Sequence, residues 1–478
     1  IDISDIICNL SLKKLNSDTL SLYIRSIRGE ESSGIKIEQL QAKVNATPEE
    51  IDIESLYLEM PSSELHADHL TLGVNDKKRF HIYGNIYSDA ITARDFKALH
   101  PALATDLPSL ALHIRTKGNE RKATADISIE AIDKSLSLDG YATISNSLTP
   151  EKRAIEINIT ESNIKSSAIT HIQKILNDST GRLNIIKRVN HINIAANAKY
   201  AAKELHSDIN LATPHGNITG NIIIDKKRNY ATTLQAMAMD LGTILQEKDL
   251  GLCNIEFTAN GTLSKGTPNG SFLTHINQLE YRNYKHSPII IEGNHGKESL
   301  ATTARFTDPN ACGEIRFFKE KRGSIAEYRL KARIDSLRPR DINLSNNCEG
   351  RLSAILEGDY ETHGNGKSQF AARIYNITHA TSEWEKSMRT FHITDNNLSD
   401  TRILVLSSDF MDINVAGHFS YKGIANTFIN MLHNHLPALS EITAPRKSDT
   451  KYSFKVEIKN TDWVSNLLEL PFTVNDLS

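Results

Sequence analysis

The chain has 478 residues, with 55 Lys and Arg against 58 Asp and Glu, and its formal net charge is -3. This length suits about three ordinary domains or one long repetitive architecture. The near-balanced charge argues against a dedicated nucleic-acid binder, because such proteins carry a strong basic excess. Hydrophobic residues make up 39% of the chain, which is below the globular average but too many for a disordered protein.

No apolar run approaches the roughly 20 residues that a transmembrane helix needs. The best runs, Ile403–Leu406 and Ile222–Ile224, have the length of a strand or less. The chain begins at Ile1 without a methionine or an apolar leader. We therefore expect a fragment or a processed piece whose targeting segments are missing.

The four cysteines, Cys8, Cys253, Cys312 and Cys348, form no CxxC pair and have no histidine at zinc-finger spacing. This excludes a disulfide scaffold and a zinc module. The sequence leaves open whether Cys312 and Cys348 pair across neighbouring strands.

Apolar residues recur at every second position along most of the chain, which predicts strands with one apolar and one wet face. Ile127 and Ile129 with Leu136 and Leu138 predict a hairpin around Ala131–Lys134. Other alternating segments begin at Ile35 and include Ile51, Ile53, Leu56, Leu58, Ile155, Ile157, Ile159, Ile192, Ile194, Leu352, Ala354, Leu356, Phe454, Val456 and Ile458. Polar connections of the hairpin type are expected at Asn75–Arg79, Asp225–Asn229, Lys319–Gly323 and Gly364–Lys367.

Helical spacing is brief. It predicts short helices at Asp95–Leu103, Ser166–Leu176, Asp240–Gln246, Ile424–Leu439 and Asp462–Leu470. The clearest one carries an apolar stripe of Ile424, Phe428, Leu432, Leu436 and Leu439. This amphipathic helix is expected to cap the sheet edge, and the sharper alternative is a gate that moves to admit a ligand.

The predicted fold class is all-β: an elongated, curled antiparallel β-sheet that forms a groove, with a few short amphipathic helices. A sheet with one apolar face can also close as a barrel or pair as a sandwich. Aromatic residues make up only 6% of the chain, so the inner positions are mostly aliphatic. Such a lining suits flexible hydrocarbon, and it equally suits an ordinary β core. The expected segments are a first groove segment at 1–160, a helical insert at 161–180, a central groove at 181–423, the amphipathic helix at 424–440 and the truncated start of a further repeat at 441–478.

No catalytic signature stands out, so we expect no enzyme activity, no catalytic residue, no bound metal and no cofactor. His66 and His69 form HxxH, but in a strand-like segment without the helix and the acid that zinc proteases need. The basic runs Asp76–Arg79 and Asp225–Arg228 are read as solvated hairpin tips, with contact to anionic head groups as the alternative.

Several stretches carry a resemblance to a known family. They are Arg28–Gly34 running into Ile35–Val44 and then Leu58–Leu65; Leu211–Gly220 followed by Asp225; Met239–Leu245 followed by Leu250 and Gly251; and Leu279–Tyr284 leading to Ile289–Gly293 and Asp308–Asn310. In order and spacing the chain resembles the TamB-like translocation and assembly module proteins, part of the AsmA-like group of Gram-negative bacteria.

The resemblance implies a periplasmic protein that is anchored in the inner membrane by an N-terminal helix and ends near an outer-membrane barrel protein of the Omp85 type. It implies a curled β-sheet whose apolar groove carries phospholipid between the inner and outer membranes and so supports outer-membrane biogenesis. An older interpretation of the family is a helper in outer-membrane protein assembly or secretion. The anchor helix and the family's C-terminal region are not recognisable here, so we expect a middle or N-proximal piece.

These expectations give a set of candidate groove residues that would contact phospholipid acyl chains. The set is Ile51, Ile53, Ile127, Ile129, Leu136, Leu138, Ile155, Ile157, Ile159, Ile192, Ile194, Ile289, Ile291, Leu352, Leu356, Val456 and Ile458. Two other classes of function remain open. One is a structural or adhesin-like β protein with a sealed core. The other is an enzyme acting on polysaccharide, which the low aromatic content disfavours.

Overall fold

The computed structural model describes residues 3–16, 18–31, 34–74, 80–97, 107–176, 183–264, 266–346, 348–364, 366–424, 427, 451–460 and 475–477. The chain is all-β, as the alternation predicts. Its strands belong to one antiparallel sheet that does not close into a barrel, and the helices in the described part are short.

Two compact units divide the chain, unit 1 from Ile1 to Asn260 and unit 2 from Gly261 to Ser478. The division falls inside the segment 181–423 that the sequence assigned to one central groove. The segment boundaries expected from the sequence stay predictions.

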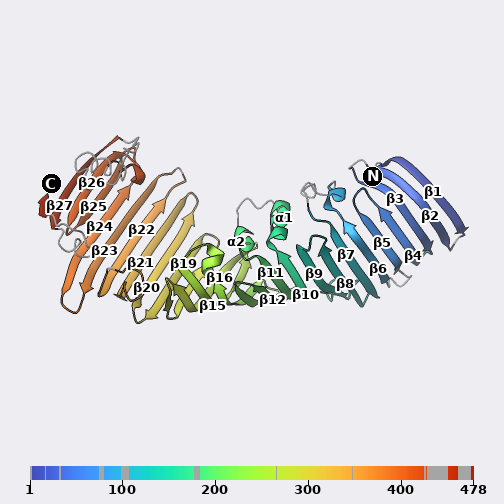
Figure 1. The fold of residues 1–478 in the computed structure, drawn as a ribbon, viewed down its shortest axis with the longest axis horizontal. Coiled ribbons are helices and arrows are strands. Elements are labelled where there is room, and N and C mark those ends of the chain that lie inside the picture. Colours follow the sequence, from blue (N-terminus) through green and yellow to red (C-terminus); the bar gives the residue numbers. More distant parts are fainter. Residues whose placement is uncertain are drawn as a thin grey trace. The chain divides into compact units, whose positions relative to one another are not determined.

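Unit 1 is a meander in which each strand from β1 to β14 pairs antiparallel with the next one along the chain (Figure 1, blue to green). The strands are β1 (Ile3–Leu15), β2 (Leu20–Glu31), β3 (Lys36–Ala46), β4 (Glu50–Glu59), β5 (Glu64–Val74), β6 (Phe80–Ile91), β7 (Leu110–Asn119), β8 (Lys122–Ala131), β9 (Leu136–Ser145), β10 (Ala154–Lys165), β11 (His191–Ala201), β12 (Glu204–Thr213), β13 (Gly216–Ile224) and β14 (Asn229–Asp240). Strand β15 (Leu250–Ser264) follows and extends past the division.

Unit 2 continues with the same kind of meander. Strand β16 pairs with the short β17 and with β18, and from β18 to β28 each strand pairs with the next. The strands are β16 (Thr267–Tyr281), β17 (Tyr284–His286), β18 (Ile289–His295), β19 (Ser299–Asp308), β20 (Ala311–Arg322), β21 (Ile325–Leu337), β22 (Arg351–Thr362), β23 (Ser368–Ala380), β24 (Glu385–Asn396), β25 (Arg402–Ser408), β26 (Met411–His418), β27 (Lys451–Asn460) and β28 (Asn475–Leu477).

The hairpin predicted around Ala131–Lys134 is confirmed, since β8 pairs with β9 and Ile129 lies opposite Leu138. The predicted turn after β13 is also confirmed. Asp225 Oδ1 accepts hydrogen bonds from the backbone N–H groups of Lys227 and Asn229, both at 2.8 Å, which makes the turn an Asx-type turn.

The prediction of a turn over Lys319–Gly323 is wrong in its extent. Strand β20 continues to Arg322, so that Lys319 is a strand residue and only the tip is a turn. Strand β20 stays paired with β21 as far as Arg322, which lies opposite Ile325, and this pairing extends the strand through the basic stretch. The turn at Gly364–Lys367 is confirmed by the bond from the His363 N–H to the Lys367 carbonyl at 2.8 Å. The expected turn at Asn75–Arg79 lies outside the described residues.

The short helices gather at one end of the strands of unit 1. Helix α1 has the predicted bounds, Ser166–Leu176, and buries Ala168. Helix α2 spans Leu183–Lys187 and packs against α1, and α3 spans Leu241–Leu245 within the predicted Asp240–Gln246.

At Asp95–Leu103 the structure begins with a 3-10 turn, η1 (Ala93–Phe96). Residues 98–103 of this predicted helix lie outside the described part. Of the predicted helix Ile424–Leu439, the structure describes only Ile424 and residue 427. Phe428, Leu432, Leu436 and Leu439, like the predicted helix Asp462–Leu470, lie outside the described residues.

Most apolar side chains are half-buried, because the sheet is a single layer. Among described residues the largest side chains with less than 2% exposure are only those of Val415, Cys253 and Ser135. A large share of the sheet's two faces therefore stays accessible to solvent. None of the four cysteines is in a disulfide bond, which answers the open question of a Cys312–Cys348 pair.

Candidate functional site

An uncharged row of side chains crosses all of β1 to β14 in unit 1. Residues that lie opposite each other on neighbouring antiparallel strands share a face of the sheet, so the register defines the row. The row, called here the unit 1 apolar row, consists of Leu10, Ile24, Ala42, Leu56, Ala67, Ile86, Ile114, Ile127, Gly140, Ile159, Ala196, Ile209, Gly220 and Leu234.

Unit 2 has an equivalent row across β16 and β18 to β27, called here the unit 2 apolar row. It also contains no charged residue. Its members are Phe272, Gly293, Thr302, Phe317, Leu330, Gly358, Ala372, Ile393, Leu406, Ile413 and Val456. A neighbouring row on the same face runs through Ile291, Ala304, Ile315, Ala332, Leu356, Ile374 and Phe391.

Register shifts keep these faces apolar where the sequence alternation changes phase. In β10 the residues on the apolar face are Ile155, Ile157 and Ile159, and then Ser162, which is buried, and Ile164. The shift between Ile159 and Glu161 against β9 absorbs the extra residue. A similar shift against β3 separates Ile53 from Leu56 in β4. Without these shifts, half of each strand would turn its apolar side chains to the opposite face.

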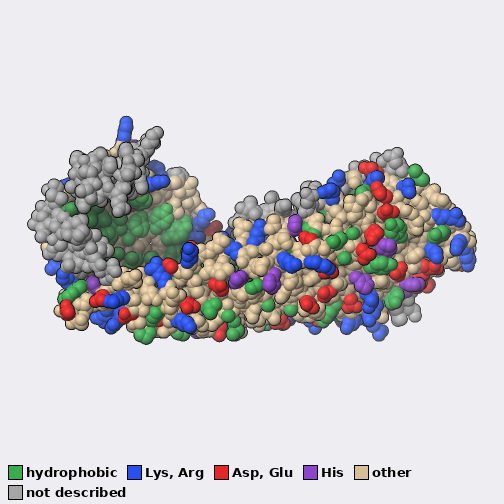
Figure 2. Space-filling model, in the orientation of Figure 1, with side chains coloured by type: hydrophobic (Ala, Val, Ile, Leu, Met, Phe, Trp, Pro, Cys, Tyr) green, Lys and Arg blue, Asp and Glu red, His purple; other side chains and the backbone are tan. Residues whose placement is uncertain are grey.

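The apolar face is accessible. Ile157 is 50% exposed, and Leu330 is 37% exposed. Figure 2 shows hydrophobic side chains gathered in a hollow over the strands of unit 2. The exposed fraction matters because a ligand gains hydrophobic free energy only from surface that water now touches.

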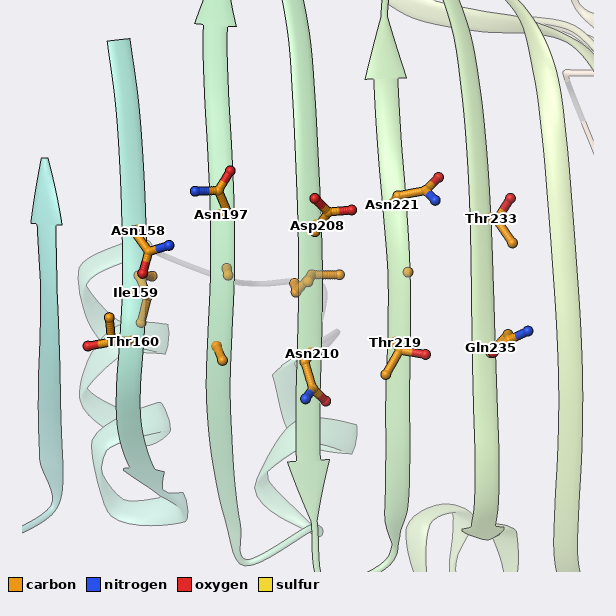
Figure 3. A pocket seen from close by; sticks show the side chains of 14 residues that line it. Asn158, Ile159, Thr160, Asn197, Asp208, Asn210, Thr219, Asn221, Thr233 and Gln235 are labelled. Atoms are coloured by element: carbon orange, nitrogen blue, oxygen red, sulfur yellow. The ribbon is translucent and has the colours of Figure 1, made fainter. Parts of the chain in front are cut away.

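The opposite face is polar in both units. In unit 1 one row on this face runs through Lys43, Ser55, Asp68, Asn85, Arg115, Asp126, Tyr141, Asn158, Asn197, Asp208, Asn221 and Thr233. Over β10 to β14 its last five members border a shallow depression of about 720 Å³, seen in Figure 3. The depression is open and lined largely by amides and hydroxyls, so it resembles a solvated sheet face.

Cross-strand ion pairs neutralise the polar face of unit 2. Arg305 pairs with Glu292 at 2.8 Å and with Glu314 at 3.1 Å, and Lys331 pairs with Glu357 at 2.7 Å. The Arg305 and Arg316 partners hold the pKa of Glu314 below its usual range against the opposing effect of burial. These charges stay on the wet side of the sheet, because neighbouring positions in a strand point to opposite faces.

A buried ion pair of Asp395 and Arg402 lies on the apolar face of unit 2. Asp395 sits opposite Phe370 and Leu404, and its side chain is 5% exposed. Arg402 and the Tyr421 hydroxyl both bond its carboxylate. The sequence analysis missed this cluster. Asp395 occupies a position where the alternation of its strand, after Phe391 and Ile393, would place an apolar residue. This break in the alternation was the available signal.

The predicted groove residues all lie on strands, and the register places each set on the apolar face of its unit. In unit 1, Leu136 lies opposite Ile164, which in turn lies opposite Ile192. In unit 2, Ile289 and Ile291 face β19, Leu352 lies opposite Leu337, and Ile458 lies opposite Met411. The sequence analysis missed the glycines and Thr302 in the rows, because they carry no apolar signal.

The HxxH motif does not form a metal site. His66 lies between the rings of Tyr57 and Tyr87, with centroid distances of 5.0 Å to each, and it stacks on Tyr87. Within the described residues no group of three or more His, Cys, Asp or Glu side chains is arranged to hold a metal ion.

Comparisons with protein-family models, curated protein sequences and solved structures gave no match. No helix in the described part of the chain has the length and hydropathy to cross a membrane.

Proposed function

We propose that this chain binds phospholipid acyl chains along its apolar face and works as part of a conduit between the inner and outer membranes of a Gram-negative cell. The observation that carries the proposal is the absence of charge along the unit 1 apolar row, from Leu10 to Leu234, and along the unit 2 apolar row. The resemblance to the TamB-like proteins supplies the periplasmic setting, the inner-membrane anchor and an Omp85-type partner as part of the same proposal.

The energetics favour passage over storage. Each buried CH₂ group of a lipid contributes about 0.8 kcal/mol, whereas a bare charge on the path costs several kcal/mol as an acyl chain crosses it. A row that carries no charge on any strand presents no such barrier between successive positions. Movement along such a row needs no catalytic residue.

The competing proposal is a structural β protein that assists outer-membrane protein assembly or secretion. Such a protein would be expected to seal its apolar face. The half-exposed Ile157 in the middle of unit 1 and Phe454, which is 45% exposed, favour the lipid proposal.

The test is native mass spectrometry with lipid extraction on the chain purified without detergent. Several phospholipids bound per chain are expected. A lipid-free mass on a folded protein would argue for the structural role.

Two charged variants locate the bound lipid. Ile157→Asp and Leu356→Asp each place a carboxylate on the apolar face, and we expect each to lower the number of captured lipids. The matched controls are Asn158→Asp and Thr394→Asp, which place the same charge on the opposite face, and these should bind lipid like the wild type. Unchanged capture in both folded apolar-face variants would remove the groove assignment.

A further inference from the structure

Across β20 to β23 the apolar face of unit 2 changes character in one direction along the strands. Its middle rows are apolar and, apart from Phe317, they are aliphatic, with Ala332 opposite Leu356 and Leu330 opposite Gly358. The next row toward the turns consists of Lys319, Tyr328, Tyr360 and Phe370, and the outermost row consists of Lys321, Ala326, Thr362 and Ser368. The face thus passes from aliphatic through aromatic to hydroxyl and ammonium groups within a few residues.

The aromatic row is packed and partly exposed. The ring centroids of Tyr328 and Tyr360 are 5.8 Å apart, and Tyr328 lies 6.4 Å from Phe317. Tyr360 is 40% exposed. Tyrosine is the residue type that membrane proteins place at the level of lipid head groups, because its ring is apolar and its hydroxyl is wet.

Two lysines give this edge a positive charge on the apolar side. The ammonium of Lys319 lies 5.7 Å from the centre of the Tyr328 ring, and Lys321 is the next residue of β20 on the same face. The register places no Asp or Glu of β20 to β23 on this face, since Glu320 and Glu327 lie on the other one. In the described part of the chain neither lysine has an ion-pair partner.

The opposite end of the same strands has no Lys or Arg in its apolar-face row, and Arg338 and Arg340 of the connection after β21 pair with Asp341 and Glu349. Its row consists of Ala311, Leu337, Leu352 and His379. Burial lowers the pKa of His379, which keeps its ring neutral at pH 7. The connection between β21 and β22 adds Ile342, a residue with only 5% exposure. The two ends of the strands therefore differ in charge and in polarity.

We propose that the turn edge of β20 to β23 is a head-group site. The phosphate of a phospholipid lies at Lys319 and Lys321, the glycerol region lies beside Tyr328 and Tyr360, and an acyl chain runs along the strands over the aliphatic rows. This inference rests on the proposed function and adds an orientation to it.

The dimensions agree with this orientation. From Leu330 to Ile334 the strand β21 advances four residues, or roughly 13 Å. The hydrocarbon layer of one bilayer leaflet is about 15 Å thick. One strand's aliphatic stretch therefore matches the length over which an acyl chain needs apolar contacts.

The test uses two phospholipid probes with the same acyl chains, one with a diazirine on the head group and one with a diazirine at the acyl terminus. Each is supplied to the full chain in phosphatidylcholine vesicles, and the cross-linked peptides are mapped by mass spectrometry. The head-group probe should label residues 319–328 and 360–368. The acyl probe should label residues 334–356.

A charge variant tests the phosphate contact. The double variant Lys319→Gln, Lys321→Gln should lower the preference for phospholipid over diacylglycerol by about fivefold for each lysine. Lys331→Gln is the matched control, because Lys331 lies on the opposite face and pairs with Glu357. It should leave the preference unchanged.

The outcomes separate the two proposals. Lipid capture with head-group labelling at residues 337–352, or a preference that the double variant does not change, overturns the head-group site and leaves the conduit standing. If neither probe labels the folded chain and no lipid is captured, both proposals fail.

Discussion

The guanidinium of Arg402 donates two hydrogen bonds to the carboxylate of Asp395, one of them from Nε to Oδ1 at 2.8 Å. Arg402 also lies over the ring of Tyr421, 4.5 Å from its centre, and donates from Nη1 to the Phe419 carbonyl at 3.3 Å. These contacts fasten the chain that follows β26 to the apolar face of unit 2. They also neutralise the charge that β24 places on that face.

Loss of the arginine should destabilise unit 2. Arg402→Met leaves the Asp395 carboxylate buried without its cation, and breaking a buried pair in this way costs about 3–5 kcal/mol. Urea denaturation followed by tryptophan fluorescence measures the change. Arg373→Met is the control, because that exposed side chain lies 3.7 Å from Glu357 on the wet face, and its loss should cost less than about 1 kcal/mol. Equal losses of unfolding free energy in the two variants would show that the buried Asp395–Arg402 pair contributes no more than an exposed ion pair.

The same pair predicts a dependence of stability on pH. Burial alone would raise the pKa of Asp395, but the bonds from Arg402 and Tyr421 and the arginine charge hold the pKa below its usual range. Asp308 behaves alike. Burial would raise the pKa of Asp308 as well, but this pKa is lowered by hydrogen bonds from the backbone N–H groups of Ser287 and Asn310 and from the Tyr284 hydroxyl.

A carboxyl with a lowered folded pKa adds stability that is present above its unfolded pKa, about 3.9, and lost as the pH falls through the folded pKa. Unit 2 should therefore be stable near pH 7 and lose stability below about pH 4. Denaturation midpoints measured between pH 7 and pH 2.5 check this. Asp308→Asn should flatten the acid limb, and an unchanged slope would contradict the assignment.

Local patterns were sufficient to predict the strands and the face that each apolar residue shares. The alternation of Ile155, Ile157 and Ile159 describes β10, and the hairpin of β8 and β9 has the predicted partners. Helix α1 has its predicted bounds because its apolar spacing is local as well. These features depend on residues within a few positions of each other.

The continuity of the apolar rows could not be predicted, because it depends on the register of neighbouring strands. Gly140 and Gly220 belong to the unit 1 apolar row only through their opposite partners, Ile159 and Leu234. The basic stretch before Gly323 looked like a turn, but pairing with β21 extends the strand through it. The contact between Asp395 and Arg402 depends on the turn between β24 and β25, which brings the two side chains together.

Thiol labelling should separate two of the cysteines. Cys8 is exposed on β1, whereas Cys253 is 1% exposed and burial raises the pKa of its thiol. The thiolate is the reactive form, so both the raised pKa and the lack of access protect Cys253. With iodoacetamide at pH 8, peptide mass spectrometry should find Cys8 modified in the native chain and Cys253 modified only after denaturation. Prompt labelling of Cys253 in the native chain would contradict its burial.

A glycine in the unit 1 apolar row is held by its neighbours. A Cβ added at Gly220 would lie 2.6 Å from the Thr233 carbonyl oxygen and would collide with the Leu234 side chain. Gly220→Ala should therefore destabilise unit 1 by about 1–3 kcal/mol, the usual cost of overpacking. Gly358 belongs to the unit 2 apolar row in the same way, but there is room at this position. A Cβ added there would lie 3.8 Å from the Ala371 carbonyl oxygen and 4.0 Å from the Ala372 Cβ.

Gly358→Ala is therefore the matched control, and we expect it to be neutral or to stabilise by about 0.4–1 kcal/mol, since alanine restricts the unfolded chain. Urea denaturation of both variants decides the point. The glycine at position 220 then has a structural reason, which is the close approach of β14, and Ile209 and Leu234 flank it in the unit 1 apolar row. Equal stability of the two variants would mean that β13 and β14 can separate to admit a methyl group, and the tight pairing of these strands would no longer explain the glycine.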